Sequence, residues 1–246
     1  MEQYAFYFDQ SRCYSCHACS VACKDWNGIE AGPEKWMSVY EWETGSFPSQ
    51  RVRSLAFPCA HCDAPACMSA CPEGAIFKED THGAVLVDSE KCTGCRSCYD
   101  ACAYGAPTFA NDEAGTKMSK CTMCIDKLEA GEMPVCVSSC PLRAFDFGPV
   151  EQIEAKYGTL RQLEGMPEPT SGPNFIVKAS GKRKQLVTYD AERAIRLLQH
   201  KEGFADDFSG EEFSASANPE LLESSELRMK HENSKDLLET LRNFAG

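Results

Sequence analysis

Cysteine thiols are the residues of this chain whose number and spacing predict chemistry. The sequence contains 246 residues and 16 cysteines. They form four sets of four: Cys13, Cys16, Cys19 and Cys23; Cys59, Cys62, Cys67 and Cys71; Cys92, Cys95, Cys98 and Cys102; and Cys121, Cys124, Cys136 and Cys140. The first and third sets have the spacing C-x2-C-x2-C-x3-C, with which thiolates hold [4Fe–4S] clusters. The sequence therefore predicts an iron–sulfur protein.

The sets are expected to work in pairs, because the fourth cysteine of such a run ligates the cluster of another run. A helix that begins near the third cysteine places the fourth about one turn, roughly 5.4 Å, further along, facing away from the others. The second and third sets are adjacent and form one pair, and the first and fourth form the other by elimination. The predicted ligands are Cys13, Cys16, Cys19 and Cys140 for cluster one; Cys23, Cys121, Cys124 and Cys136 for cluster two; Cys59, Cys62, Cys67 and Cys102 for cluster three; and Cys71, Cys92, Cys95 and Cys98 for cluster four. Four [4Fe–4S] clusters are the expected cofactors.

Two other uses of abundant cysteine fit the sequence less well. Disulfide scaffolds are usually short secreted chains whose cysteines are rarely bunched in repeated x2 steps. Structural zinc sites use pairs of C-x2-C instead of x2-x2-x3 runs. Catalytic signatures are also missing from the sequence, which has no Ser/His/Asp set, phosphate loop or dinucleotide fingerprint. We expect a chain that is itself not an enzyme.

The net charge of −12, from 25 basic and 37 acidic residues, argues against nucleic acid as a partner. No apolar run approaches the roughly 20 residues of a membrane helix. The first residues lack the basic and apolar regions of a signal peptide and a twin-arginine pair. We expect a soluble chain without a direct membrane span, either cytoplasmic or exported with a leader-bearing partner to the outer face of the cytoplasmic membrane.

Short segments of strand character surround the cysteine sets. Strands are predicted at residues 4–9, 39–42, 52–57, 75–78 and 84–87, and a helix at 125–130. The order strand, cluster loop, short helix, strand recurs along the chain. The predicted class is α+β, with two interleaved bacterial-ferredoxin-like two-cluster modules and a C-terminal extension. Residues 1–50 and 111–150 form the outer module, and residues 51–110 form the inner one.

Beyond the last cysteine, the chain is predicted to wrap around these modules and then to extend. Residues 151–200 are a wrapping segment, with a helix at 150–157, an extended stretch at 165–173, strands at 174–177 and 186–189 and a helix at 190–198. Residues 201–246 are an acidic helical C-terminal extension. Leu237, Leu238, Leu241 and Phe244 form an apolar stripe at helical spacing. Two interpretations stay open for this stripe: it covers its own subunit, or it docks a partner.

Histidine and basic residues near the cysteines carry weaker signals. His17 and His61 lie inside cysteine runs and are either donors beside a cluster or ordinary surface or packing histidines. We favour the second interpretation, since sixteen cysteines already saturate four clusters. Lys120, Lys127 and Arg96 stand beside or within cysteine sets. They either offset cluster charge or dock a partner, or they are solvated surface charges, and we favour the last interpretation.

Four motifs resemble the iron–sulfur electron-transfer subunit of dimethyl sulfoxide reductase and its relatives. They are CYSCHACSVACKD at residues 13–25, HCDAPAC at 61–67, KCTGCRSCYDACAYGAP at 91–107 and CPLRAFDFGP at 140–149. The resemblance covers about residues 3–178, and residues 179–246 lie beyond it. It implies the same ligand pairing, and four intact cysteines in the third set, where some relatives lack one and hold a [3Fe–4S] cluster.

The resemblance also implies partners. One is a large catalytic subunit with a molybdenum (or tungsten) bis-pterin cofactor, and the electron donor is quinol through a membrane anchor subunit, or a soluble donor, as in anaerobic respiration. The family reduces varied substrates that this chain would not touch, so it does not name one. The alternative function is a free-standing polyferredoxin that shuttles electrons without a dedicated partner.

Overall fold

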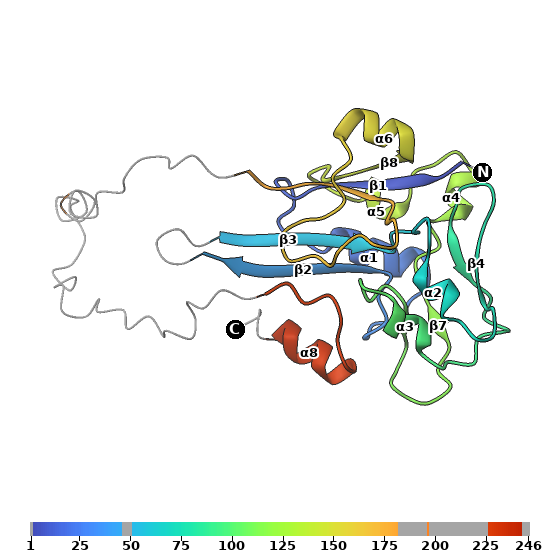
Figure 1. The fold of residues 1–246 in the computed structure, drawn as a ribbon. Coiled ribbons are helices and arrows are strands. Elements are labelled where there is room, and N and C mark those ends of the chain that lie inside the picture. The colour runs from blue at the N-terminus through green and yellow to red at the C-terminus, as the bar shows by residue number, and fades with distance from the viewer. Residues whose placement is uncertain (1, 46–50, 182–195, 197–225, 243–246) are drawn as a thin grey trace, which may run out of the picture.

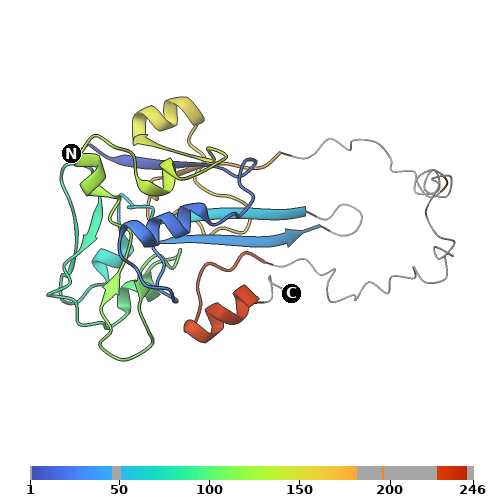
Figure 2. The same ribbon diagram turned by 180° about the vertical axis from the view of Figure 1, so that it is seen from behind.

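The computed structural model describes residues 2–45, 51–181, 196 and 226–242. Its central layer is a three-stranded sheet in the order β8-β1-β9. Strand β1 (Tyr4–Asp9) lies antiparallel to β8 (Phe145–Pro149) and parallel to β9 (Phe175–Lys178). The N-terminal strand therefore lies beside the strand that follows the last cysteine, as the two views of the ribbon show (Figure 1 and Figure 2).

Both faces of β1 are buried, which explains its nearly continuous aromatic sequence. Phe6 and Phe8 face the main core, and the Phe6 ring lies 4.8 Å from that of Phe147. The opposite face packs under helix α6 (Val150–Tyr157), where the Tyr7 ring stacks on Tyr157 at 3.6 Å. Aromatic rings of this size contribute much of the apolar area that a small core buries.

Three hairpins complete the strand structure. β2 (Met37–Thr44) pairs with β3 (Arg51–Pro58), β4 (Ile76–Lys78) with β5 (Val85–Val87), and β6 (Thr108–Phe109) with β7 (Met118–Ser119), all antiparallel. The first hairpin crosses the middle of the molecule in Figure 1. The strands predicted at 4–9, 39–42, 52–57, 75–78, 84–87 and 174–177 are confirmed, with ends that differ by one or two residues.

Each cysteine set begins within five residues of the end of a strand. Strands β1, β3, β5 and β7 lead into Cys13, Cys59, Cys92 and Cys121, respectively. Short helices follow within the sets: α1 (Ala18–Trp26), α2 (Ala66–Ser69), α3 (Ser97–Ala101), α4 (Ile125–Glu129) and α5 (Val135–Ser138). This recurring order agrees with an α+β fold built from ferredoxin-like units.

The C-terminal residues 226–242 return to the body of the protein and end in helix α8 (Ser234–Arg242). Met229 is buried in the main core, and the Tyr99 hydroxyl donates to the carbonyl of His231 at 2.9 Å. This described part of the extension therefore covers its own subunit. The elements predicted at 186–189 and 190–198, and the side chains of Leu241 and Phe244, lie outside the described residues.

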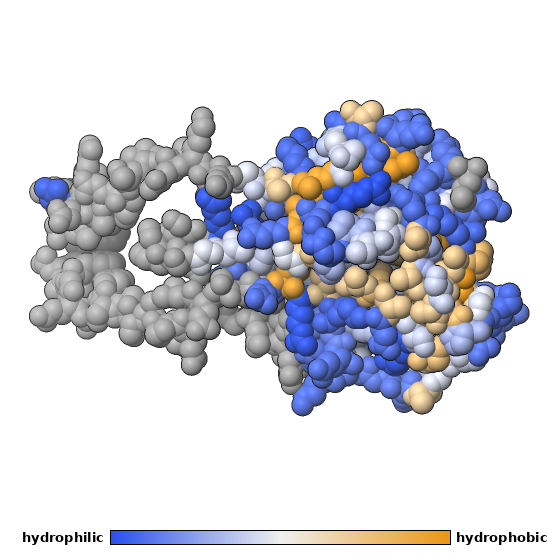
Figure 3. All heavy atoms as spheres, in the orientation of Figure 1, coloured by the Kyte–Doolittle hydropathy of each residue, from blue (hydrophilic) through white to orange (hydrophobic). Residues whose placement is uncertain are grey.

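The face of the molecule seen in Figure 3 mixes hydrophilic residues with apolar areas between them. None of the helices within residues 2–45, 51–181 and 226–242 is long and apolar enough to cross a membrane.

Candidate iron–sulfur sites

Site one consists of Cys13, Cys16, Cys19 and Cys140, which line one small cavity. Cys19 lies on α1, and Cys140 follows α5, so the two ends of the cysteine-containing region meet here. Ser15 and His17 have φ angles of +56° and +59°. These left-handed residues curl the backbone between successive cysteines, so that their thiols face the same space.

Site two consists of Cys23, Cys121, Cys124 and Cys136, all of which are buried. Burial raises the pKa of the Cys136 thiol well above its usual range, and the proximity of Cys121, Cys124 and Cys23 raises it further. The four residues are therefore assigned to one candidate site, although Cys23 comes from a set almost a hundred residues away in the sequence.

Site three consists of Cys59, Cys62, Cys67 and Cys102, which line a second cavity together with Lys120. Cys59 directly follows β3, and Cys67 lies on α2.

Site four consists of Cys71, Cys92, Cys95 and Cys98, which line a third cavity. Gly94, between the second and third of these residues, has a φ angle of +74°. A Cβ atom there would lie 2.6 Å from the carbonyl carbon of Gly115, so both the turn and the close approach require glycine. The predicted cysteines of sites one, three and four thus each line one cavity.

Short helices connect one site with the next. Helix α1 carries Cys19 of site one and Cys23 of site two. Helix α2 carries Cys67 of site three and ends next to Cys71 of site four, and α3 packs beside it. The fourth cysteine of a set therefore points to a neighbouring site, as the x3 spacing predicts.

Several of the thiols are too buried to ionise by themselves. Burial raises the pKa of Cys19 and Cys23 to about 12 and that of Cys98 to about 11. A thiolate at neutral pH then requires a cation that displaces the proton, as bound iron does. No cysteine forms a disulfide.

The described thiols do not converge on a single point. Among the described residues, no group of three or more His, Cys, Asp or Glu side chains converges closely enough to bind one metal ion. Zinc needs four ligands at about 2.3 Å from one point. Four thiols around one cavity are the kind of ligand set that holds a [4Fe–4S] cluster.

Backbone amides supply hydrogen bonds to the sulfur atoms. The N–H of Ala75 donates to Cys71 Sγ at 3.3 Å, and the N–H of Ala144 donates to Cys140 Sγ at 3.3 Å. These two alanines stand four residues after the last cysteine of their sets. Such bonds stabilise anionic sulfur and influence the reduction potential of a cluster.

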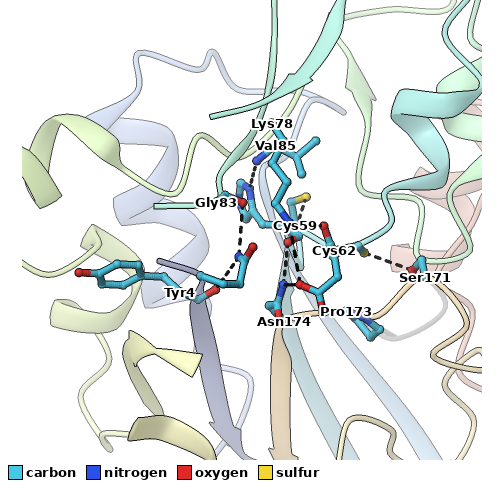
Figure 4. A network of polar contacts seen from close by, with 12 residues as sticks. Tyr4, Cys59, Cys62, Lys78, Gly83, Val85, Ser171, Pro173 and Asn174 are labelled. Carbon is cyan, nitrogen blue, oxygen red and sulfur yellow. Dashed lines mark hydrogen bonds and ion pairs between the residues drawn. The ribbon is translucent and has the colours of Figure 1, made fainter. Parts of the chain in front are cut away.

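A polar network fixes the loop between Cys59 and Cys62 (Figure 4). Wholly buried His61 accepts a hydrogen bond at Nδ1 from the N–H of Val85 at 2.9 Å, and Asn174 donates to its carbonyl at 2.9 Å. His61 is therefore a packing residue that joins this loop to β5, in agreement with one of the two roles predicted for it. Burial, followed by the positive charges of Lys120 and Lys78, holds its pKa well below the usual range.

Two residues of the wrapping segment belong to this network and were not predicted from the sequence. Ser171 Oγ donates to Cys62 Sγ at 3.2 Å, and Asn174 also donates to Asp63 at 2.9 Å. They lie more than a hundred residues from the residues that they contact, so no local spacing signals their role.

The interpretation of Lys120 as a solvated surface charge is wrong. Its side chain is buried, with 2% of the residue exposed, and Nζ donates to the carbonyls of Val85 and Cys121. Lys127 pairs with Glu132 and covers the Trp26 ring, and Arg96 pairs with Asp112 at 3.6 Å. Of the three cations, Lys120 is the one enclosed between cysteine sites.

The fold and these sites define an iron–sulfur electron-transfer protein. The 4Fe-4S dicluster domain family matches residues 51–150. The probable anaerobic dimethyl sulfoxide reductase chain YnfG of Escherichia coli is 42% identical over 186 residues, which cover 72% of this chain and 88% of the relative. An anaerobic dimethyl sulfoxide reductase chain of Haemophilus influenzae is 40% identical over 190 residues, 72% of this chain and 90% of the relative.

A sulfite dehydrogenase subunit of Allochromatium vinosum matches a longer stretch. It is 35% identical over 239 residues, 86% of this chain and 97% of the relative. The protein belongs to the family of iron–sulfur electron-transfer subunits of dimethyl sulfoxide reductase-like molybdopterin oxidoreductases. The resemblance predicted from the four motifs is confirmed.

Proposed function

We propose that this protein binds four [4Fe–4S] clusters and relays single electrons between a donor and a molybdenum bis-pterin catalytic subunit. The observation that carries the proposal is a set of three cavities, each lined by four cysteines from two sequence sets. The electrostatic effect of Cys121, Cys124 and Cys23 on Cys136 supports a fourth site. Such clusters accept and release one electron each. No catalytic residue is proposed, and substrate chemistry takes place on the partner.

Each of the four sites is proposed to hold one cluster through its four thiolates. The pairing of β1 with β8 and the contact between α1 and α5 support an outer module of residues 1–50 and 111–150. The contact between α2 and α3 and the β4–β5 hairpin support an inner module of residues 51–110.

The sites are proposed to act in the linear order one, two, three, four. Cys19 of site one raises the pKa of Cys136 of site two, and Cys59 of site three raises that of Cys121 of site two, each after larger effects such as burial. Sites three and four share helices α2 and α3, since the second and third cysteine sets contribute to both. Neighbouring sites therefore lie close enough to influence one another electrostatically.

The two ends of this order reach the surface. Cys16 of site one and Cys95 of site four are the two exposed cysteines. Electrons are proposed to enter at one of these ends and leave at the other, with the catalytic subunit at one end and the donor, such as a membrane anchor subunit, at the other.

Purification of the native complex tests the partner proposal. A tagged form of this protein, isolated anaerobically, is expected to bring down a large subunit that contains molybdenum or tungsten and pterin. Recovery of the tagged protein alone, with its iron and without such a subunit, would instead favour a free-standing polyferredoxin.

A further inference from the structure

Lys120 is a lysine whose side chain is buried in the interior of the protein. Only 2% of the residue is exposed, and its ammonium group donates to two backbone carbonyls, those of Val85 and Cys121. Within the described residues, no carboxylate forms an ion pair with it. A buried cation without a negative partner is costly, so the protein must provide negative charge nearby by other means.

Two cysteine sites are the available source of that charge. Lys120 lines the cavity of site three beside Cys59 and Cys67. It directly precedes Cys121 of site two in the sequence. Its charge lowers the pKa of both Cys67 and Cys121, against the larger effect of burial. The ammonium group therefore lies between site two and site three, in the middle of the proposed relay.

Two other basic side chains lie near sites two and three, His61 and Lys78, but neither places an unpaired positive charge between the two sites as Lys120 does. His61 is neutral, because burial and the two neighbouring lysines hold its pKa far below the usual range. Lys78 donates to the carbonyl of Cys62 at 3.1 Å and pairs with Asp63 at 3.8 Å, so its charge is offset on the side of site three.

We propose that Lys120 is a fixed positive charge that raises the reduction potentials of the clusters at site two and site three. The inference rests on the proposed function, since it requires clusters at both sites. Reduction of a cluster adds one electron and one unit of negative charge, with no bond made or broken and no proton transferred. The ammonium group stabilises the more negative, reduced form at either site, and thereby raises both reduction potentials.

The test compares Lys120→Met and Lys120→Gln with the wild type in the intact complex. Methionine matches the length of the lysine stem without the charge, and glutamine keeps an N–H donor. The matched control is Lys91→Met: Lys91 also directly precedes the first cysteine of a set, but its side chain is 62% exposed and pairs with Asp88 at 3.0 Å. Redox titration monitored by electron paramagnetic resonance is the readout, with iron per chain measured on the same samples.

Two of the redox transitions are expected to move to more negative potentials in both Lys120 variants, while the other transitions and all those of Lys91→Met stay unchanged. Unchanged potentials, or a shift confined to one transition, would overturn the proposal. Loss of iron in both variants would also overturn it, because Lys120 would then hold the loop instead of tuning the clusters. A wild type without iron would refute the proposed function itself, which separates the two failures.

Discussion

Cys19 and Cys23 lie one turn apart on α1 and yet belong to different sites. Cys19 shares a cavity with Cys13, Cys16 and Cys140, whereas the thiol of Cys23 lies close enough to Cys124 for that neighbour to raise its pKa, after burial. One short helix therefore joins two candidate clusters. A similar relationship recurs at α2, which carries Cys67 of site three and ends two residues before Cys71 of site four.

This division predicts that Cys19→Ser and Cys23→Ser damage different clusters. Each variant is expected to lose or alter one cluster of the proposed four, about a quarter of the bound iron at most. The two spectra should differ, because Cys19→Ser changes site one and Cys23→Ser changes site two. Electron paramagnetic resonance of the reduced variants checks this. Identical spectral losses in both would contradict the division.

The hydrogen bond from Ser171 to Cys62 predicts an effect of the wrapping segment on site three. Ser171→Ala removes a donor to sulfur, and one redox transition should shift to a more negative potential by on the order of 40 mV, the equivalent of about 1 kcal/mol. Ser138→Ala is the control, because in the described part of the chain Ser138 Oγ bonds only to carbonyls of, or next to, its own helix. An equal shift in both variants would argue against a specific role of the bond.

Close packing at Gly105 predicts that a single methyl group loosens the C-terminal segment. Gly105 has a φ angle of +61°, and a Cβ atom there would lie 2.6 Å from the carbonyl oxygen of Met229. Gly131→Ala is the control, with a φ angle of +73° and open space around the added atom. Backbone strain costs about 1 kcal/mol in both variants.

Gly105→Ala is expected, in addition, to detach residues 226–238 from the body of the protein, whereas Gly131→Ala is not. Hydrogen exchange of that segment is the measurement, and faster exchange is expected in Gly105→Ala alone. Equal protection in the two variants would show that the contact with Met229 does not hold the segment.

The burial of His231 predicts that residues 226–238 pack less tightly against the rest of the protein in mild acid. Burial lowers its pKa below 6.5, against the opposing charge of Asp236. The neutral form is therefore favoured in the folded segment, and this stabilisation is present above pH 6.5 and is lost as the pH falls through the lowered folded pKa. Exchange of residues 226–238, corrected for intrinsic rates, should be faster at about pH 5.5 than at about pH 7.5. A His231→Gln variant should show the same exchange rate of residues 226–238 at both pH values. Slower exchange in acid than at neutral pH in the wild type would contradict the prediction.

The cysteine sites and the strands around them could be predicted from the sequence, because their signals are local. The x2 and x3 spacings fix which thiols lie on one curl and which lie a helical turn away. The position of Lys120 could not be predicted in this way. Lys91 and Lys120 both directly precede a cysteine set, yet one side chain is 62% exposed and the other residue only 2%. Burial of Lys120 depends on β5 and on site three, which come from other parts of the sequence.

The contributions of Ser171 and Asn174 were missed for a related reason. Ser171 lies in a proline- and glycine-rich stretch, where serine indicates a turn, and Asn174 begins a predicted strand. Neither pattern shows what the side chain contacts in the folded protein. Their partners, Cys62 and His61, lie more than a hundred residues earlier, and only folding brings them together.

The most direct test of the account is the amount of iron and acid-labile sulfide bound per chain after anaerobic purification. Four [4Fe–4S] clusters predict about 16 iron atoms and about 16 sulfide ions per chain. A preparation without iron, or one in which the same sixteen thiols bind zinc or are joined as disulfides, would contradict it.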